Sequence, residues 1–253
     1  MNRKKLGLKL HQDLSFSSTF QYMSHSKHVF WPGCALMKLD PSILEKTLAH
    51  LRLVDAEMGI SSFCCVSPTR SVFPEKLKNR RDQIFQALKK REVETIYTAC
   101  PSCLKDLRSM GLQVEMIWPM LLEAIRIKGL PRLETGPFNL QDPCPLRREK
   151  DSHESVRSIL EAIEIDVVEV VASRDKTICC GEIEMLHITD TPKSEALRDR
   201  RLSSFDHPVI GYCEGCVSKF KPVTSSIHLL ELLFGESGAR TWMNRYRNSR
   251  GWR

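Results

Sequence analysis

The stretch PVIGYCEGC, residues 208–216, is a short β-branched run that leads directly into a C-x-x-C motif. The stretch ETIYTACPSC, residues 94–103, has the same form in the first half of the chain. Each motif is followed by an apolar segment at helical spacing, at 118–125 and 227–234. A strand, a cysteine loop and a helix therefore recur, which predicts two similar halves.

All ten cysteines of the 253-residue chain follow one pattern that is written twice. Each copy has a lone cysteine, an adjacent pair and a C-x-x-C, with 29, 34 and 2 residues between them in the first copy and 34, 32 and 2 in the second. The first set is Cys34, Cys64, Cys65, Cys100 and Cys103, and the second set is Cys144, Cys179, Cys180, Cys213 and Cys216. Cysteines that served only as small buried hydrophobes would not need this repetition.

Helical and β-branched segments alternate along both copies. Helix patterns occupy 41–53, 74–92 and 152–163, and strand patterns occupy 94–98, 138–141, 166–171 and 208–212. Alternation of this kind predicts an α/β fold with two tandem pseudo-repeats, mainly parallel sheets flanked by helices, and cysteine-rich loops at the strand ends.

Breaker residues and charge divide the chain into four parts. The expected parts are a basic N-terminal tail 1–27, a first repeat 28–135, a second repeat 136–235 and a basic C-terminal tail 236–253, with a linker at 128–137. Residues 1–28 and 236–253 each hold five Lys/Arg against one acidic residue, so the net charge of +7 comes from the two ends. Basic tails alone are weak support for nucleic-acid binding. We expect flexible tails, with docking to an acidic partner or an anionic membrane surface as the alternative.

The N-terminal sequence does not predict secretion. Residues 11–28 are polar and supply no apolar core for a signal peptide, and no apolar run approaches the roughly 18 residues that span a bilayer. We therefore expect a cytoplasmic protein with no transmembrane segment. A reducing cytosol keeps thiols free, which excludes a disulfide framework.

Two kinds of metal site remain for the cysteines. A C-x-x-C offers two thiolates with the bite that tetrahedral zinc needs, but four ligands would suffice and each copy has five. Neighbouring side chains on an extended backbone diverge, so an adjacent pair reaches two metal atoms more naturally than one. This favours iron–sulfur clusters, although neither standard ferredoxin spacing is present.

The motif C-xn-C-C-G-xn-C-x-x-C resembles the CCG cysteine-rich domains of heterodisulfide reductase and of related iron–sulfur subunits in glycerol-3-phosphate and lactate oxidation systems. The second copy matches it throughout, and the resemblance covers roughly residues 28–235. It implies a noncubane [4Fe-4S] cluster on Cys144, Cys179, Cys180, Cys213 and Cys216.

The first copy departs from this pattern at Val66, where the family has glycine. Glycine permits positive φ, whereas valine is stiff, so we expect the loop to take another path or to make room differently. A second [4Fe-4S] cluster or zinc is expected on Cys34, Cys64, Cys65, Cys100 and Cys103.

The resemblance implies an electron-transfer subunit of an oxidoreductase complex. The chain has no G-x-G-x-x-G fingerprint, so electrons would arrive through a flavoprotein or a ferredoxin-type subunit and leave to a disulfide or a quinone. The alternative is a zinc-stabilised structural or interaction subunit without redox activity. Lys105, Arg147, Arg148 and Lys219 lie near ligands in sequence, where they could balance an anionic cluster or simply be exposed helix charges.

Overall fold

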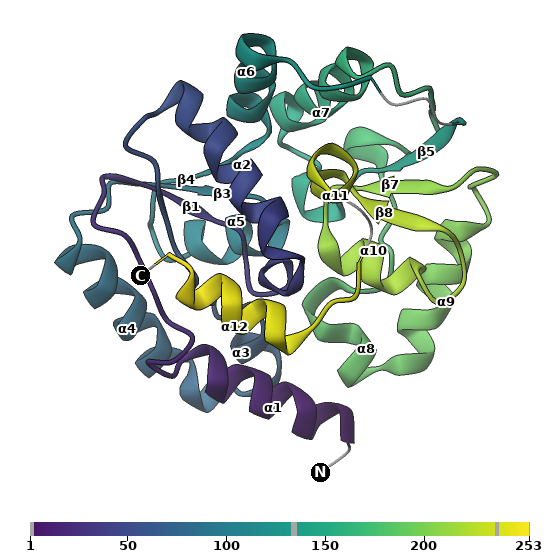
Figure 1. The fold of residues 1–253 in the computed structure, drawn as a ribbon. Coiled ribbons are helices and arrows are strands. Elements are labelled where there is room, and N and C mark those ends of the chain that lie inside the picture. The colour runs from purple at the N-terminus through teal and green to yellow at the C-terminus, as the bar shows by residue number, and fades with distance from the viewer. Residues whose placement is uncertain (1–2, 133–135, 236–237, 253) are drawn as a thin grey trace.

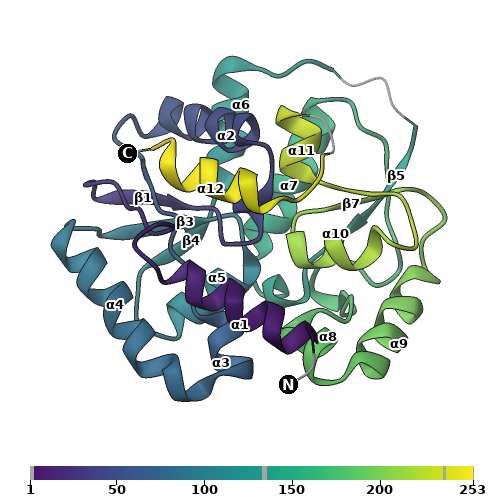
Figure 2. The ribbon, with the colours of Figure 1, turned by 60° about the horizontal axis from the view of Figure 1, so that its bottom comes forward.

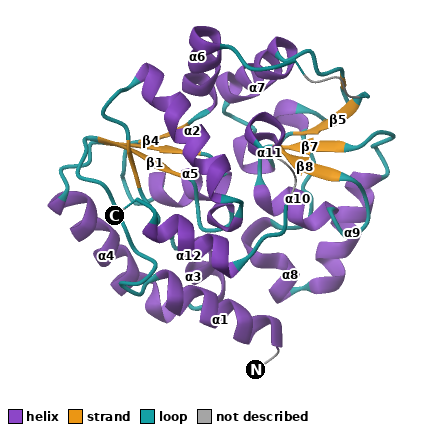
Figure 3. Cartoon of the chain, viewed as in Figure 1, coloured by secondary structure: helices purple, strands orange, loops and turns teal. Residues whose placement is uncertain are grey.

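The chain forms two four-stranded parallel sheets that lie side by side (Figures 1 and 3). The computed structural model describes residues 3–132, 136–235 and 238–252. The first sheet has the order β2-β1-β3-β4 and the second the order β6-β5-β7-β8. The strands are β1 (His28–Trp31), β2 (Gly59–Ile60), β3 (Thr95–Thr98), β4 (Val114–Met116), β5 (Phe138–Gln141), β6 (Val167–Val168), β7 (Val209–Gly211) and β8 (Ser226–His228). The predicted α/β fold with two parallel-sheet halves is confirmed.

Twelve α-helices connect and cover the strands of the described chain. They are α1 (Arg3–Ser15), α2 (Pro41–Val54), α3 (Ser67–Val72), α4 (Leu77–Lys90), α5 (Pro101–Arg108), α6 (Trp118–Lys128), α7 (Lys150–Ala162), α8 (Leu186–Thr189), α9 (Thr191–Leu202), α10 (Glu214–Phe220), α11 (Leu229–Phe234) and α12 (Trp242–Arg250). Proline occupies the first turn of α2, α3, α5, α6 and α9, a position that suits its fixed φ and missing N–H. None of the described helices combines the length and apolar character needed to cross a bilayer.

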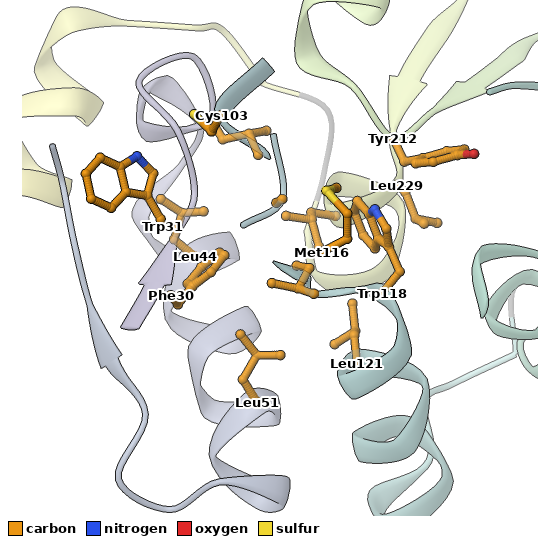
Figure 4. Packing of buried hydrophobic residues seen from close by; sticks show 14 of the residues in the cluster. Phe30, Trp31, Leu44, Leu51, Cys103, Met116, Trp118, Leu121, Tyr212 and Leu229 are labelled. Atoms are coloured by element: carbon orange, nitrogen blue, oxygen red, sulfur yellow. The ribbon is translucent and has the colours of Figure 1, made fainter. Parts of the chain in front are cut away.

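The two halves share one hydrophobic core. Helix α6 packs against α2 of its own half and α7 of the other, and α11 packs on α2 (Figure 2). The indole of Trp118 meets the ring of Tyr212 edge-on at 5.7 Å and lies 6.5 Å from His228, so side chains of both halves interlock (Figure 4). The relative position of the halves is therefore fixed by burial of apolar surface.

Most of the expected elements are present. Strand β5 spans the predicted residues, whereas the predicted helix at 227–234 begins as β8 and becomes helical at Leu229. Strands β1, β2 and β4, of two to four residues each, were not predicted. Part of the expected linker, residues 133–135, lies outside the described residues.

The basic ends are helical and not the flexible tails that the sequence predicted. Helices α1 and α12 lie side by side on the first half (Figures 1 and 2). Arg245 donates a hydrogen bond of 2.7 Å to Ser15, and its guanidinium lies 5.6 Å from the Phe20 ring. Asn248 donates to the carbonyl oxygens of Met37 and Leu39, each at 3.0 Å. These ends are ordered by buried polar contacts, which a hydrophobic pattern does not reveal.

Candidate functional site

The ten cysteines lie at the carboxyl ends of the parallel strands, at the same place in each half. Cys34 and Cys144 follow the first strand of each half, and the adjacent pairs follow the second. Cys100 and Cys213 are the N-cap residues of α5 and α10, so the second cysteine of each C-x-x-C falls in the first helical turn. Ligands and cofactors usually bind at this edge of parallel sheets.

The structure brings each set of five sulfurs together. Hydrogen-bonding contacts join the thiols of each set into an unbroken series, and the order of the series is the same in both halves. The first series is Cys34, Cys64, Cys65, Cys103, Cys100, and the second is Cys144, Cys179, Cys180, Cys216, Cys213. Within the described residues, no three His, Cys, Asp or Glu side chains form a ready site for a single ion.

Both sets face one cavity of about 160 Å³ between the halves. Eight of the ten cysteines line it, all but Cys64 and Cys179. The rest of the wall is mixed, with apolar side chains such as Ile183 and Met185 and the carboxylates Glu182 and Glu214. The halves thus enclose a shared site, in which a group of roughly the size of benzene would fit.

Backbone amides stabilise negative charge in the second set. The pKa of Cys179 is lowered to about 2 by hydrogen bonds from the Cys144 and Cys180 thiols and from the backbone N–H groups of Gly181 and Ile183. The Gly181 nitrogen lies 3.2 Å from the sulfur of Cys179. Cysteine binds metal as the thiolate, so these hydrogen bonds favour the form of Cys179 that a metal would require.

The N-terminus of helix α10 stabilises a thiolate in the C-x-x-C of the second set. The pKa of Cys213 is lowered by the hydrogen bond from Cys216 and by the N–H groups of Cys216 and Gly215, the free amides of the first turn of α10. The pKa of Cys144 is raised because its thiol donates to Cys179 and is buried. In the second set the pKa is therefore lowered at two sulfurs, Cys179 and Cys213, and raised at the other three.

The first set is completed by helix α1, which the sequence did not indicate. The Nε2 of Gln12 donates to the sulfur of Cys64 at 3.6 Å, and His11 hydrogen-bonds Cys34. The pKa of Cys34 is raised to about 12 by its bond to Cys64 and by burial. The pKa of Cys65 is lowered by bonds from Cys103 and Cys64. No sequence signal links residues 11 and 12 to a cysteine more than 20 positions away.

Positive φ angles shape both cysteine loops. Gly33 has φ +90°, and a Cβ there would lie 2.8 Å from the Cβ of Cys100. Gly181 has φ +88°, and a Cβ there would lie 2.1 Å from the carbonyl oxygen of Ser194. Val66 has φ 67° and is fully buried. Of the two expectations for Val66, another path for the loop is not found, since Val66 keeps the left-handed turn at a cost of about 1–3 kcal/mol, and the loop instead accommodates the side chain differently.

Helix α9 explains why the second loop needs glycine and the first does not. The backbone of α9 lies directly over Gly181, and the Ser194 hydroxyl donates to the Gly181 carbonyl oxygen at 2.7 Å. Val66 is instead the N-cap residue of α3, and its side chain is buried in the shared hydrophobic core. Both loops thus have a residue with positive φ at this position. They differ in that the second loop has no room for a side chain there.

The donor chemistry of both sets suits a thiophilic metal. Cysteine thiolates bind zinc and iron–sulfur groups, whereas hard cations require oxygen ligands. Ten sulfurs in two matched sets, each at a sheet edge of an α/β half, define a cysteine-rich metal-binding type of protein.

The chain belongs to the CCG cysteine-rich domain family. The family model, described as "Cysteine-rich domain", matches residues 28–108 and 138–221, one copy in each half. This is an iron–sulfur-type domain, consistent with a role in electron transfer. Kinship with heterodisulfide reductase remains a prediction.

Other comparisons add no argument about function. No curated protein shows significant sequence similarity to the chain. Aspartate racemase from Picrophilus torridus is 14% identical over 82% of this chain and 91% of its own, with a TM-score of 0.34. An aspartate racemase homologue from Pyrococcus horikoshii OT3 is 13% identical over 90% and 97%, with a TM-score of 0.30. These scores are too low to support an inference.

The cations that are close to ligands in sequence lie mainly on the surface. Lys105 is exposed and pairs with Glu184 at 2.9 Å, and Arg147 binds the Thr177 carbonyl oxygen. Two other arginines, Arg80 and Arg201, are buried and lie within electrostatic range of the cysteines. They are far from the adjacent cysteine pairs along the chain, so sequence proximity could not find them.

Proposed function

We propose that this chain is an iron–sulfur electron-transfer subunit of a heterodisulfide-reductase-like complex. It would hold a noncubane [4Fe-4S] cluster on the second set and a second [4Fe-4S] cluster or zinc on the first. The observation that carries the proposal is the matched pair of five-sulfur series on one cavity. When bound, an iron–sulfur cluster supplies one-electron transfer at a potential set by its surroundings.

The arrangement of the sulfurs favours a cluster over a single zinc ion. Zinc needs four ligands around one centre, whereas each set has five sulfurs joined in series. The adjacent cysteines of each pair face different neighbours, as Cys179 contacts Cys144 and Cys180 contacts Cys216. A cluster with several metal atoms can bind sulfurs at both ends and in the middle of such a series.

The chain itself supplies charge and enclosure to the site. Backbone N–H groups at Cys179 and Cys213 favour their thiolate forms before any metal binds. Most of the cysteines are buried, and burial from water strengthens electrostatic effects at the site. Because both sets face the same cavity, a disulfide or quinone placed there would be within reach of both centres.

A partner must deliver the electrons, and the basic ends favour an acidic one. Helices α1 and α12 are joined by the bond between Arg245 and Ser15, and their exposed cations include Lys4, Lys5, Arg247 and Arg250. A flavoprotein or ferredoxin-type subunit with an acidic surface would be attracted to these cations.

The test is metal analysis of protein purified without oxygen. We expect several irons and a comparable amount of inorganic sulfide per chain, with a brown colour. Cys180→Ala should remove the signal of the second centre and leave the first, and Cys65→Ala should do the reverse, so that each variant is the control for the other. Colourless protein with zinc and no sulfide would overturn the proposal in favour of a structural subunit.

A further inference from the structure

Each half buries one arginine beside its cysteines, from the same element of the repeat. Arg80 lies on α4 and Arg201 on α9, the helices between the adjacent cysteine pair and the third strand of each half. The two residues are 4% and 0% exposed. Fully buried arginines are rare unless a negative charge accompanies them.

Arg201 has no carboxylate partner among the described residues. Its Nε donates to Oε1 of Gln141 at 2.5 Å, and its Nη1 donates to the Ala172 carbonyl oxygen at 2.9 Å. The guanidinium lies 4.6 Å from the centre of the Phe205 ring. In the described part of the chain, Nη2 has no hydrogen-bond partner. Burial of a charge under these conditions is strongly unfavourable, so an anion is expected nearby.

Arg80, at the equivalent position of the first half, has a carboxylate partner. Its Nη2 lies 2.9 Å from Oδ1 of Asp13, and its Nη1 donates to Thr69 at 2.8 Å and to Gln12 at 3.2 Å. The carboxylate that balances Arg80 comes from helix α1. The described part of the second half has no counterpart of α1, which leaves Arg201 without such a partner.

The sulfurs of the second set become anions near Arg201 when they bind metal as thiolates. Helix α9 lies on the CCG loop through the bond between Ser194 and Gly181, and Phe205 packs against the buried group that contains Cys180 and Cys216. Burial lowers the pKa of Arg201, and the charges of Asp142 and then of Cys216 and Cys180 oppose this lowering.

Asp142 is the other negative charge near Arg201, and it is already engaged. It accepts from both terminal nitrogens of Arg157 at 2.9 and 3.0 Å, from the Tyr212 hydroxyl at 2.5 Å and from the backbone N–H of Arg174 at 2.7 Å. Its charge is balanced without Arg201. This leaves the second cysteine set, with which Arg201 interacts electrostatically, as the source of a balancing charge.

We propose that Arg201 is the fixed counter-charge of the metal centre on the second cysteine set and raises the reduction potential of that centre. This inference rests on the proposed function. Reduction adds an electron to a group that is already anionic, and a buried cation stabilises the reduced form more than the oxidised form. The arginine acts on the cofactor through its charge and binds no metal.

The experiment is a redox titration of the full chain, purified without oxygen and followed by electron paramagnetic resonance. The second centre is identified as the signal that Cys180→Ala removes. Arg201→Gln should change the reduction equilibrium of this centre at least tenfold toward the oxidised form. For one electron this lowers the potential by about 59 mV. Arg200→Gln, on the exposed side of the same helix, is the matched control and should leave the potential unchanged.

Arg201→Lys separates charge from hydrogen bonding. It keeps the positive charge and loses the planar fork, so its potential should stay closer to that of the unaltered chain than the Gln variant does. If Arg201→Gln yields no folded protein, the Lys variant decides, and a tenfold shift in it overturns the inference. Equal potentials in the Arg201→Gln and Arg200→Gln variants also overturn it while the proposed function stands. Unaltered chain without iron and sulfide refutes the proposed function itself.

Discussion

Replacement of Gly181 by alanine tests the close packing of α9 on the CCG loop. The new Cβ would lie 2.1 Å from the Ser194 carbonyl oxygen, and Cβ contacts under 3.0 Å essentially do not occur, so α9 has to move by almost 1 Å. The oxygen belongs to the backbone of a helix and cannot rotate away. The bond from the Ser194 hydroxyl to the Gly181 carbonyl, 2.7 Å long, would be lost in the shift.

The expected loss in free energy of unfolding has three parts. Alanine in the left-handed region costs about 1–2 kcal/mol. Displacement of packed structure costs about 1–3 kcal/mol, and the lost hydrogen bond about 1 kcal/mol. Gly111 is the matched control, since it has φ +79° and an added Cβ there meets nothing within 4 Å. Gly111→Ala should therefore show only the first part, and the two variants should differ by about 2–4 kcal/mol.

The measurement is urea unfolding of the reduced, metal-free protein, followed by circular dichroism and extrapolated to water. Metal-free protein is used because a change in metal affinity would otherwise add to the difference. A difference between the two variants below about 0.5 kcal/mol, the usual size of surface effects, would refute the packing argument. Conformational strain alone would then account for the glycine.

Three further changes probe buried groups outside the cysteine sets. Burial lowers the pKa of His228 from 6.5 to about 3, so the unfolded chain takes the proton first and stability falls with pH from about 6.5 toward 3. The slope is about 1.4 kcal/mol per pH unit, and urea midpoints against pH should be less steep in His228→Leu. Arg240→Met leaves Glu231 buried without its ion pair and should cost about 3–5 kcal/mol by thermal unfolding, whereas Arg132→Met removes an exposed pair and should cost about 0–1 kcal/mol. Tyr212→Phe removes a buried bond of 2.5 Å and should cost about 1–3 kcal/mol in urea, and an unchanged midpoint would contradict this.

The doubled fold and the two sets of sulfurs could be predicted from the sequence. A C-x-x-C after a β-branched run indicates where a strand ends, because both cysteines must sit in the turn that follows. The repeat of that unit at 94–103 and 208–216 predicted two halves, and the structure has them. Cysteines whose position is set by the strand next to them in sequence can therefore be predicted from the sequence.

Contacts between distant segments could not be predicted in this way. Gln12 reaches Cys64 across 52 positions, and it belongs to a helix whose buried face is polar. Arg201 carries a charge that a sequence pattern assigns to the surface. Both are buried because other charges and donors surround them, and that information exists only once the chain has folded.

The contact between α1 and α12 has a consequence for biosynthesis. Arg245 holds His11 at 3.1 Å, and His11 in turn bonds Cys34. The ribosome makes the first cysteine set long before it makes residue 245, so this sulfur site stays incomplete while the rest of the chain is translated. The contacts of α12 with the first helix therefore form only when synthesis of the chain is nearly finished.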